Sequence, residues 1–351
     1  MLNSSPHITT IIPTYKRPEK LRKAIESVLY QTYPYFQVCI YDNASGDSTA
    51  DVVTECINKD PRVFYRSHSQ DIGAGENMQF ALKQVTTPFF SFLADDDFLL
   101  PEFYETTLKG FEKYPDAGCS LGAVIEIEDH GEVIGVPLTR WQDREYFSPP
   151  NSLLEMIGKY SNWTGALFRT AAANQLGSLD TSISAIDVDF LFRFAARYPV
   201  AISKKPCAVF VHHTSSYSNT HVLELYWPTW LKLITKIHEE KEILPEIKIQ
   251  LEHMLETDLQ RGLFVAAVKC IEKKKFQEAA AAIELFCQQS SSKGKRNFLT
   301  TTLTICQRFP FMQRGFSALL GLRRFWKRHI KGFRLQRKYR KLIARARGAV
   351  L

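Results

Sequence analysis

The chain has 351 residues, of which 45% are hydrophobic and 12% aromatic, and this composition supports a packed core and excludes a disordered protein. The net charge of +8 is divided unevenly, because residues 285–351 hold 17 Lys and Arg and no Asp or Glu, whereas residues 1–284 hold 28 basic and 37 acidic residues. The seven cysteines include no C-x-x-C pair, which excludes the usual zinc-site pattern.

The first third of the chain alternates strand and helix patterns. β-Branched and aromatic runs indicate strands, and apolar residues at helical spacing indicate helices. Together they predict strands over 8–12, 36–41, 63–67 and 89–93, with helices over 19–29, 49–59 and 74–85 between them. This alternation predicts an α/β fold with a mostly parallel, Rossmann-like sheet flanked by helices.

The fourth predicted strand ends in three adjacent carboxylates, Asp95, Asp96 and Asp97. Three neighbouring like charges raise the free energy of the empty protein, so we expect a cation or a hydrogen-bonding polyol beside them. Hard oxygen ligands favour Mg²⁺ or Mn²⁺, which usually keep coordination positions for substrate phosphates. A solvated acidic turn is the alternative interpretation of the triplet taken alone.

Polar residues also follow the first two strands. Thr14 and Tyr15 come after the first, and Asp42 and Asn43 come after the second. Because ligands of open parallel sheets bind beyond the carboxyl ends of the strands, these residues and the triplet predict a nucleotide site. Tyr15 would cover a base, and Asp42 would accept hydrogen bonds from a base N–H or a ribose. Taken singly, the same residues are typical of turns and helix caps.

Four sequence blocks resemble one known family. IIPTY at 11–15, IESVLYQTY at 25–33, YDNASGDST at 41–49 and LADDD at 93–97 have the order and spacing of the large family of inverting nucleotide-sugar glycosyltransferases with the A-type fold, which is family 2-like. The resemblance is specific over residues 8–115 and weaker to about 220. The residues it assigns to the donor nucleotide are Pro13, Thr14, Tyr15, Arg17, Asp42 and Asn77.

The resemblance also implies roles for the triplet, with Asp95 near the ribose and Asp96, together with Asp97, on the Mg²⁺ or Mn²⁺ bound to the diphosphate. The sequence departs from the family at two places. Glu76 stands where an arginine often meets the nucleotide, and Ala94 replaces a frequent aspartate.

A catalytic base is expected in the predicted helix that begins near residue 185. Alignment on Arg193 puts Asp187 at the family's base position, with Asp189 as the fallback. Without the resemblance, Asp187 is simply an acidic residue that favours a helix start. The family often has a metal- or diphosphate-binding histidine near His213, although a loop histidine is commonly only solvated.

Two further segments are candidates for the acceptor side. Residues 137–150 lose periodicity and contain Trp141 and Tyr146, so we expect a loop over the site, with a plain connector as the alternative. Trp163 opens a block that in the family passes beneath the acceptor. It would stack on a sugar ring or belong to the core.

The chain is helical in pattern beyond residue 220, which gives three expected parts: a nucleotide-sugar-binding domain over 1–220, a helical domain over 221–292 and a basic C-terminal tail over 293–351. We expect two antiparallel helices joined at 273–275, and a linker at 290–295. Aromatic and aliphatic residues among Lys and Arg in the tail are typical of a helix bound to an anionic membrane surface. Docking of the tail on the acidic body is the alternative.

The sequence thus predicts a metal-dependent inverting glycosyltransferase that moves a sugar from a nucleotide sugar, expected to be a UDP-sugar, to a saccharide or lipid-linked acceptor in surface polysaccharide synthesis. No stretch approaches membrane-span length and no signal peptide is expected, so we predict a cytoplasmic enzyme, peripheral on the inner face of the membrane, without nucleic acid. The alternatives are a nucleic-acid- or membrane-binding protein with a non-catalytic body, and a nucleotidyltransferase, which the lack of a Gly-rich phosphate loop disfavours.

Overall fold

The computed structural model describes residues 7–157, 159, 163–213, 222–240, 243–327 and 333–348. It divides the chain into two compact units, which are described separately below. An α/β unit comprises Met1–Ser182, Ile186–His212 and Leu335–Leu351, and a helical unit comprises Ile183–Ala185 and His213–Arg334.

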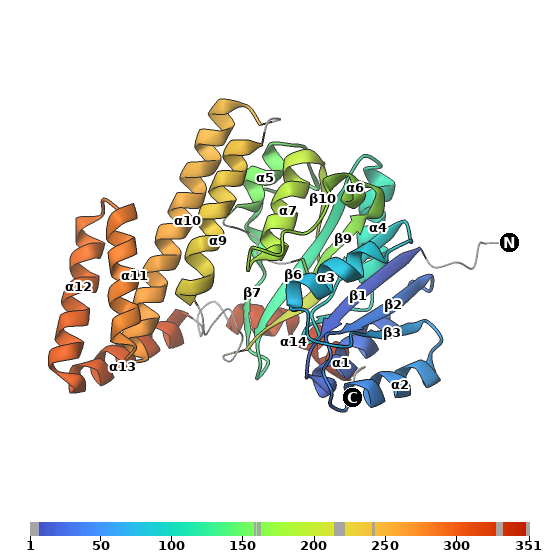
Figure 1. Ribbon diagram of the computed structural model, residues 1–351, viewed down its shortest axis with the longest axis horizontal. Coiled ribbons are helices and arrows are strands. Elements are labelled where there is room, and N and C mark those ends of the chain that lie inside the picture. Colours follow the sequence, from blue (N-terminus) through green and yellow to red (C-terminus); the bar gives the residue numbers. More distant parts are fainter. Residues whose placement is uncertain are drawn as a thin grey trace. The chain divides into compact units, whose positions relative to one another are not determined.

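The α/β unit is built on a ten-stranded sheet (Figure 1). Eight strands follow the order β3-β2-β1-β4-β9-β6-β10-β5, and the other two pair at the side of this path, β7 with β6 and β8 with β10. The strands are β1 (Ile8–Thr14), β2 (Phe36–Asp42), β3 (Val63–Ser67), β4 (Phe89–Phe92), β5 (Phe98–Leu99), β6 (Cys119–Glu128), β7 (Val133–Gly135), β8 (Tyr146–Phe147), β9 (Ala166–Arg169) and β10 (Val200–His212).

Strand direction decides where the strands end. β3, β2, β1 and β4 are parallel neighbours, and β6 and β10 are parallel to each other. β9 lies between β4 and β6 and is antiparallel to both, so all six of the others point the same way. The carboxyl ends of β1, β2, β4 and β10 therefore meet along one edge of the sheet, where Thr14 and Asp42 are register partners.

Helices cover the sheet on both faces. In Figure 1, α3 and α7 lie in front of the strands. A core of buried side chains joins α1, α2 and α4 to β1 and β2, and it includes Ile12, Ile25, Val53 and Tyr104. The helices of the unit up to β10 are α1 (Pro18–Leu29), α2 (Thr49–Lys59), α3 (Ala74–Lys83), α4 (Phe103–Lys113), α5 (Asn151–Met156), α6 (Thr170–Leu176) and α7 (Ile186–Arg197), with a 3-10 helix, η1 (Pro137–Arg140). The predicted α/β class is confirmed.

The expectation of a loop over the site at residues 137–150 is wrong. η1 and β8 form here, and β8 pairs with Val200 and Ala201 at the start of β10, which is the opposite edge of the sheet from the ends of β1 and β4. Trp141 and Phe147 are buried and pack edge to face. Burial of these aromatic side chains fixes the segment against the far end of the sheet, away from the predicted nucleotide site.

The helical unit contains α9 (Val222–Glu239), α10 (Pro245–Glu272), α11 (Phe276–Gln289), α12 (Lys293–Arg308) and α13 (Pro310–Lys327). The predicted pair of helices joined at 273–275 is confirmed by α10 and α11, whose shared core includes Leu263, Ala267 and Phe286. Only three residues separate α11 from α12, so the predicted linker at 290–295 is shorter than expected, and its second half, 293–295, is the start of α12. Within the described ranges, no helix combines the length and the hydropathy needed to cross a bilayer.

The last helix, α14 (Phe333–Gly348), packs on the α/β unit. Tyr339 and Ile343 are buried, and Gln336 Oε1 accepts a hydrogen bond of 2.8 Å from the backbone N–H of Val133. The tail is therefore not one element, because α12 and α13 belong to the helical unit while α14 completes the α/β unit.

Candidate active site

Three clusters predicted from separate parts of the sequence meet at the carboxyl edge of the sheet. Thr14 ends β1, Asp42 ends β2, and Asp95 follows β4 by three residues. The Thr14 hydroxyl donates a hydrogen bond of 2.8 Å to Asp95 Oδ2. The neighbouring Asn43 N–H donates 3.0 Å to the Thr14 carbonyl oxygen. These bonds hold the first two strand ends and the triplet together.

The three aspartates of the triplet have different surroundings. Asp95 is buried and accepts from Thr14 and from Arg17 Nη1 at 3.1 Å. Burial raises the pKa of the Asp95 carboxyl, and the Arg17 charge opposes this rise. Asp96 is more accessible, and its Oδ2 lies 2.9 Å from Arg17 Nη1 and 3.8 Å from Lys20 Nζ. Two cationic side chains therefore face Asp96.

Asp97 is held inside the fold. Its Oδ2 accepts from the Thr164 hydroxyl at 2.7 Å, and its Oδ1 accepts from the Val211 N–H at 2.9 Å. Complete burial, with the charge of Asp96 as a second cause, raises the pKa of Asp97 well above its usual range. In this position Asp97 ties the end of β10 to the turn before β9, and its predicted contact with a metal ion stays a prediction.

Arg17 lies between Asp95 and Asp96 and contacts both carboxylates through Nη1. A positive group is thus already present where the sequence predicts a cation, which accounts for the stability of adjacent carboxylates in this structure. The pairing of Arg17 with the triplet was not predicted, although Arg17 was assigned to the donor nucleotide.

The residues at this edge fit a divalent cation that is only partly held by protein. In the ranges that the structure describes, no group of three or more His, Cys, Asp or Glu side chains is arranged to hold a metal ion. Mg²⁺ is commonly bound through one or two carboxylates and completed by substrate phosphates. Asp96, with Asp95 beside it, provides such a donor set. His213 is the first residue after β10 and falls in the helical unit, so its predicted role stays a prediction.

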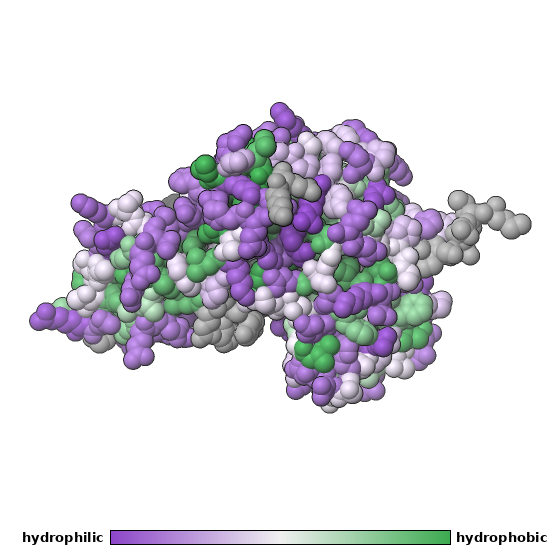
Figure 2. Space-filling model, turned by 45° about the horizontal axis from the view of Figure 1, so that its top comes forward, coloured by the Kyte–Doolittle hydropathy of each residue, from purple (hydrophilic) through white to green (hydrophobic). Residues whose placement is uncertain are grey.

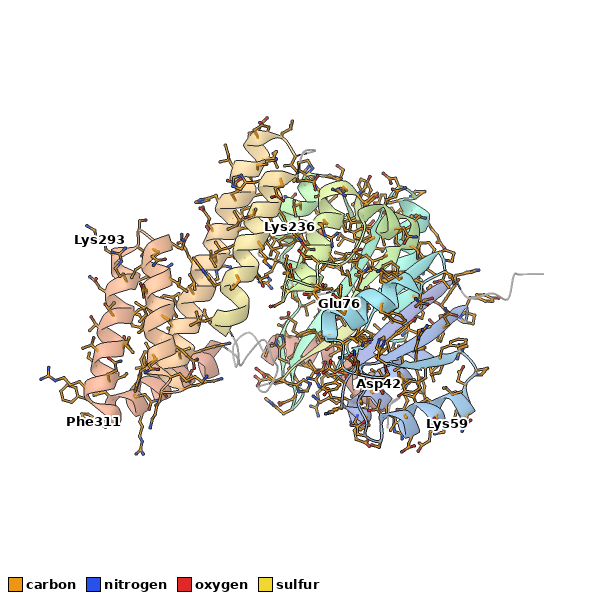
Figure 3. All side chains as sticks on the ribbon, in the orientation of Figure 1. Asp42, Lys59, Glu76, Lys236, Lys293 and Phe311 are labelled. Atoms are coloured by element: carbon orange, nitrogen blue, oxygen red, sulfur yellow. The ribbon has the colours of Figure 1, made fainter. Side chains whose placement is uncertain are left out.

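Asp42, labelled in Figure 3, is buried at the end of β2, and we call it the floor of the predicted nucleotide site. The carboxylate is 2% exposed and accepts from the Ser45 N–H at 3.0 Å, the Ser45 hydroxyl at 2.5 Å and the Tyr65 hydroxyl at 2.6 Å. Burial and the Asp42 charge raise the pKa of Tyr65 to about 12. Ser45 and Tyr65 were missed from the sequence. The register of β2 and β3, which pairs Asp42 with Ser67, places Tyr65 two residues before that pair.

The Tyr15 side chain is exposed to solvent in the loop that follows β1. It is 40% exposed, and Lys16 Nζ lies 4.8 Å from the ring centroid. Lys16 has a φ of 54°, and its backbone N–H donates 2.8 Å to the Ser45 hydroxyl, so the loop after β1 is attached to the loop after β2. Pro13, in β1, precedes the loop. An exposed ring above a polar floor suits stacking on a base.

Asn77 has a structural role in the same region. Its Nδ2 donates 2.8 Å to the Tyr41 carbonyl oxygen, and its Oδ1 lies 3.0 Å from His68 Nε2. Both ends of this buried amide are thereby engaged within the fold. Direct contact between Asn77 and a nucleotide stays a prediction.

The start of α7 carries the predicted base. Asp187 is half-buried, and burial raises the pKa of its carboxyl to about 7, with the N–H groups of Val188 and of Asp187 itself opposing the rise. Asp189 is fully buried and ion-paired, with Oδ2 2.8 Å from Arg193 Nε. Arg193 also donates to the Ser178 carbonyl oxygen at 3.0 Å. Asp189 is therefore a structural residue, and Asp187 is better suited to proton transfer.

Glu76 explains how α7 is placed next to α3. The Thr181 hydroxyl donates 2.7 Å to Glu76 Oε1, and a Cβ on Gly75 would lie 3.0 Å from Ile186 Cδ1. The acidic residue that replaces the family's arginine thus attaches the loop before α7. Asp187 lies one residue beyond Ile186 and is held close to the amino-terminal end of α3.

Trp163 belongs to the core. It is 8% exposed, and its ring stacks on Phe92 at 4.2 Å with an interplanar angle of 15°. Phe190 of α7 packs against the same indole edge to face. Of the two interpretations offered by the sequence, the core one agrees with this packing.

Comparison with known proteins agrees with this fold. Residues 9–177 match the model of the family described as Glycosyl transferase family 2. An uncharacterized glycosyltransferase of Methanocaldococcus jannaschii is 26% identical over 131 residues, which is 37% of this chain and 45% of that protein. A Campylobacter jejuni protein named GalNAc(5)-diNAcBac-PP-undecaprenol beta-1,3-glucosyltransferase is 30% identical over 105 residues, 30% of this chain and 34% of that one. The chain thus matches less than half the length of these two relatives.

Solved structures share the fold over most of the chain. S. aureus TarS 1–349 in complex with UDP-GlcNAc has a TM-score of 0.62 at 15% identity, covering 88% of each chain. Mannosyltransferase PcManGT from Pyrobaculum calidifontis, in complex with GDP-Man and Mn²⁺, has a TM-score of 0.56 at 17% identity, covering 94% of this chain and 87% of the other. The chain thus contains a glycosyltransferase family 2-like domain over residues 9–177 and has the A-type fold of these structures.

Proposed function

We propose that the protein is a metal-dependent inverting glycosyltransferase that moves a sugar from a nucleoside diphosphate sugar to a hydroxyl of a saccharide or lipid-linked acceptor. One observation carries most of this proposal. An accessible carboxylate faced by two cationic side chains, Asp96, and a carboxylate whose pKa is raised to about 7, Asp187, belong to one unit and have buried neighbours that fix them. The cationic side chains beside Asp96 suit binding of the donor diphosphate, and Asp187 suits proton transfer.

The donor would lie across the ends of β1 and β2. Tyr15 stacks on the base, and the Asp42 floor accepts a base N–H or a ribose hydroxyl. Arg17 and Lys20 bring positive charge beside the triplet, where it stabilises the diphosphate. A UDP-sugar is the donor we favour, since TarS 1–349 was solved with UDP-GlcNAc, and the GDP-Man complex of PcManGT makes GDP-sugars the next donors to test.

Asp187 carries the proton-transfer step. Its carboxylate accepts the proton of the acceptor hydroxyl while that oxygen attacks the anomeric carbon, and the nucleoside diphosphate leaves from the opposite face with inversion. A pKa near 7 is matched to this task, because the group is a usable base at neutral pH and binds the transferred proton firmly enough. A Mg²⁺ or Mn²⁺ ion on Asp96, with Asp95 beside it, would supply stabilisation of the developing diphosphate charge.

A lipid-linked or surface-polysaccharide acceptor is supported by the name of the Campylobacter jejuni relative, which includes PP-undecaprenol. The basic tail would be attracted to an anionic membrane surface. We therefore propose a cytoplasmic enzyme that is peripheral on the inner face of the membrane. The family match disfavours the alternative of a non-catalytic body whose tail binds nucleic acid.

A donor panel tests the proposal. The purified full chain is incubated with UDP-, GDP- and dTDP-sugars, with Mn²⁺, with Mg²⁺ or with EDTA, and nucleotide release is measured. We expect slow hydrolysis of one donor class that EDTA abolishes and Mn²⁺ restores. Release that is equally fast in EDTA would contradict metal dependence, and no release from any donor would contradict the transferase assignment.

A further inference from the structure

The apolar side chains of α13 and α14, two helices of the tail, differ in exposure. In α14, Tyr339 and Ile343 are buried on the α/β unit. In α13, Phe311 is 68% exposed and Leu319 is 65% exposed. The apolar side chains of α14 are therefore used within the protein, whereas those at the start of α13 face solvent. Of these two helices, only α13 therefore has strongly exposed apolar side chains among the described residues.

The opposite face of α13 is anchored, which fixes the outward direction of these residues. Gln313 is buried, and its Nε2 donates 2.5 Å to the Glu272 carbonyl oxygen at the end of α10. Phe316 packs against the buried cluster that contains Ile271 and Cys306. Gln313 and Phe316 are three residues apart and share one face, so Phe311 lies on the opposite face of the helix. Leu319 lies at the side of the anchored face and is exposed.

Five exposed apolar side chains lie at the junction of α12 and α13 and along α13. We call them the outer corner: Ile305, Phe309, Phe311, Met312 and Leu319. Each of these side chains is between 37% and 68% exposed, and the rings of Phe309 and Phe311 lie 6.0 Å apart. Figure 3 shows Phe311 at this end of the helical unit, directed away from the helices. Figure 2 shows hydrophobic residues reaching the surface of the helical unit among hydrophilic ones.

Positive charge surrounds this surface. The Arg308 guanidinium lies 5.8 Å from the centroid of the Phe309 ring, and Arg314 is exposed one turn into α13. No acidic residue occurs anywhere after Glu284. Exposed aromatic and aliphatic residues flanked by arginines suit the boundary between acyl chains and anionic headgroups. A second copy of the chain suits the corner less well, because a two-fold contact would bring Arg308 and Arg314 toward their own copies.

We propose that the outer corner is the membrane-docking site of the protein, with Phe311, Met312 and Leu319 inserted below the headgroups of an anionic bilayer and with Arg308 and Arg314 among the phosphates. This inference rests on the proposed peripheral location and adds the element that makes the contact. It assigns no insertion to α14, whose basic outer face can contribute only through charge.

Vesicle co-sedimentation of the full chain tests the proposal. Vesicles of phosphatidylcholine with about one quarter phosphatidylglycerol are compared with pure phosphatidylcholine at low and high salt. The double variant Phe311→Ser with Leu319→Ser should lower the partition coefficient on the order of tenfold or more, because each buried apolar side chain contributes substantially to insertion. Arg308→Gln with Arg314→Gln should lower it about tenfold at low salt and have little effect at high salt.

Matched control variants distinguish binding through the outer corner from non-specific binding by exposed side chains elsewhere. Ile249 is 68% exposed on α10, and Ile249→Ser is the control for loss of an exposed apolar side chain. Lys293→Gln with Lys295→Gln, at the other end of α12, is the control for loss of two positive charges. Retained binding in Ile249→Ser with loss in the corner variant supports the proposal. Equal binding of wild type and corner variant, equal loss in Ile249→Ser, or equal binding to neutral vesicles overturns it. So does a dimer in analytical ultracentrifugation that the corner variant loses.

Nucleotide release without vesicles separates this inference from the proposed function. The corner variant should release nucleotide from a soluble donor at the wild-type rate, since the corner lies outside the proposed catalytic residues. Wild-type protein that binds vesicles but turns over no donor would refute the transferase proposal and leave the docking site standing. Wild-type protein that turns over donor but ignores anionic vesicles would refute the docking site alone.

Discussion

The acidic triplet after β4 and the first residues of α7 both place aspartates close together, and in each segment the fold uses one carboxylate and leaves another accessible. Asp97 and Asp189 are fully buried and bonded, the first to Thr164 and the second to Arg193. Asp96 and Asp187 are more accessible and carry the proposed chemistry. Identical side chains one or two residues apart thus differ in role because their neighbours differ.

The buried carboxylates keep the accessible ones in place. A buried carboxylate that accepts two hydrogen bonds or an ion pair is costly to disturb, so it fixes the backbone on which the reactive carboxylate is carried. Substitution of the structural member should therefore change stability, and substitution of the reactive member should change rate. The predictions below test that division.

The largest expected effect is on rate. Asp187→Asn keeps the shape of the side chain but removes its basicity, so kcat should fall by about 10²–10⁴-fold, the usual contribution of a positioned general base. The dissociation constant for UDP with Mn²⁺ should stay within about threefold of wild type, measured by calorimetry. A kcat within a few-fold of wild type would assign the proton to another group.

Stability should depend on Asp189 more than on Asp187, which is the reverse of their expected effects on rate. Asp189→Ala leaves Arg193 without its buried partner and should lower the free energy of unfolding by about 3–5 kcal/mol. Asp187→Asn should not destabilise the protein at pH 8, because a carboxyl whose folded pKa is about 7 opposes folding when it is ionised. Urea unfolding of both variants at pH 8 checks this. Comparable destabilisation by both would remove the distinction between them.

The pH dependence of transfer follows from the raised pKa of Asp187. The carboxylate must be ionised to accept a proton, so kcat/KM should rise about tenfold per pH unit below pH 7 and level off above it. The unfolded-state pKa is lower, so the contribution of this group to stability falls as the pH rises from about 4 to about 7. A flat rate profile between pH 5.5 and 7.5 would argue against Asp187 as the base.

Smaller effects are expected at the residues that support the triplet and α7. Thr164→Val leaves Asp97 with one fewer donor and should cost about 1–3 kcal/mol of stability. Glu76→Gln keeps a hydrogen-bond acceptor for Thr181, so we expect a change of about 1 kcal/mol or less, with kcat lowered only a few-fold. Thermal unfolding with initial-rate measurements distinguishes the two. A larger rate loss in Glu76→Gln than in Asp187→Asn would place Glu76 in the chemistry.

Much of the fold could be predicted because its signals are local. The helix at 49–59 and the strand at 63–67 have the predicted bounds, and the family and the A-type fold are confirmed. The antiparallel β9 between β4 and β6, and β8 at the far end of β10, were not predicted. Their pairing depends on contacts between residues far apart in sequence, which periodicity does not report.

The sequence predicted the main residues of the site but not the side chains that contact them. Sequence patterns indicated Thr14, Asp42 and the triplet, since each follows a strand. The sequence did not indicate that Arg17 bridges Asp95 and Asp96, that Tyr65 completes the Asp42 floor, or that α14 buries its own apolar residues. A charge pattern shows that a helix is basic and amphipathic, but the surface that covers its apolar side is decided by tertiary packing.

Calorimetric titration of UDP into the full chain with and without Mn²⁺, for wild type, Asp96→Asn and Asp187→Asn, tests the division of roles most directly. We expect Mn²⁺ to strengthen UDP binding to wild type and to Asp187→Asn alike, and we expect Asp96→Asn to lose this Mn²⁺-dependent gain. Equal Mn²⁺-dependent binding by Asp96→Asn and wild type would show that Asp96 does not hold the metal ion.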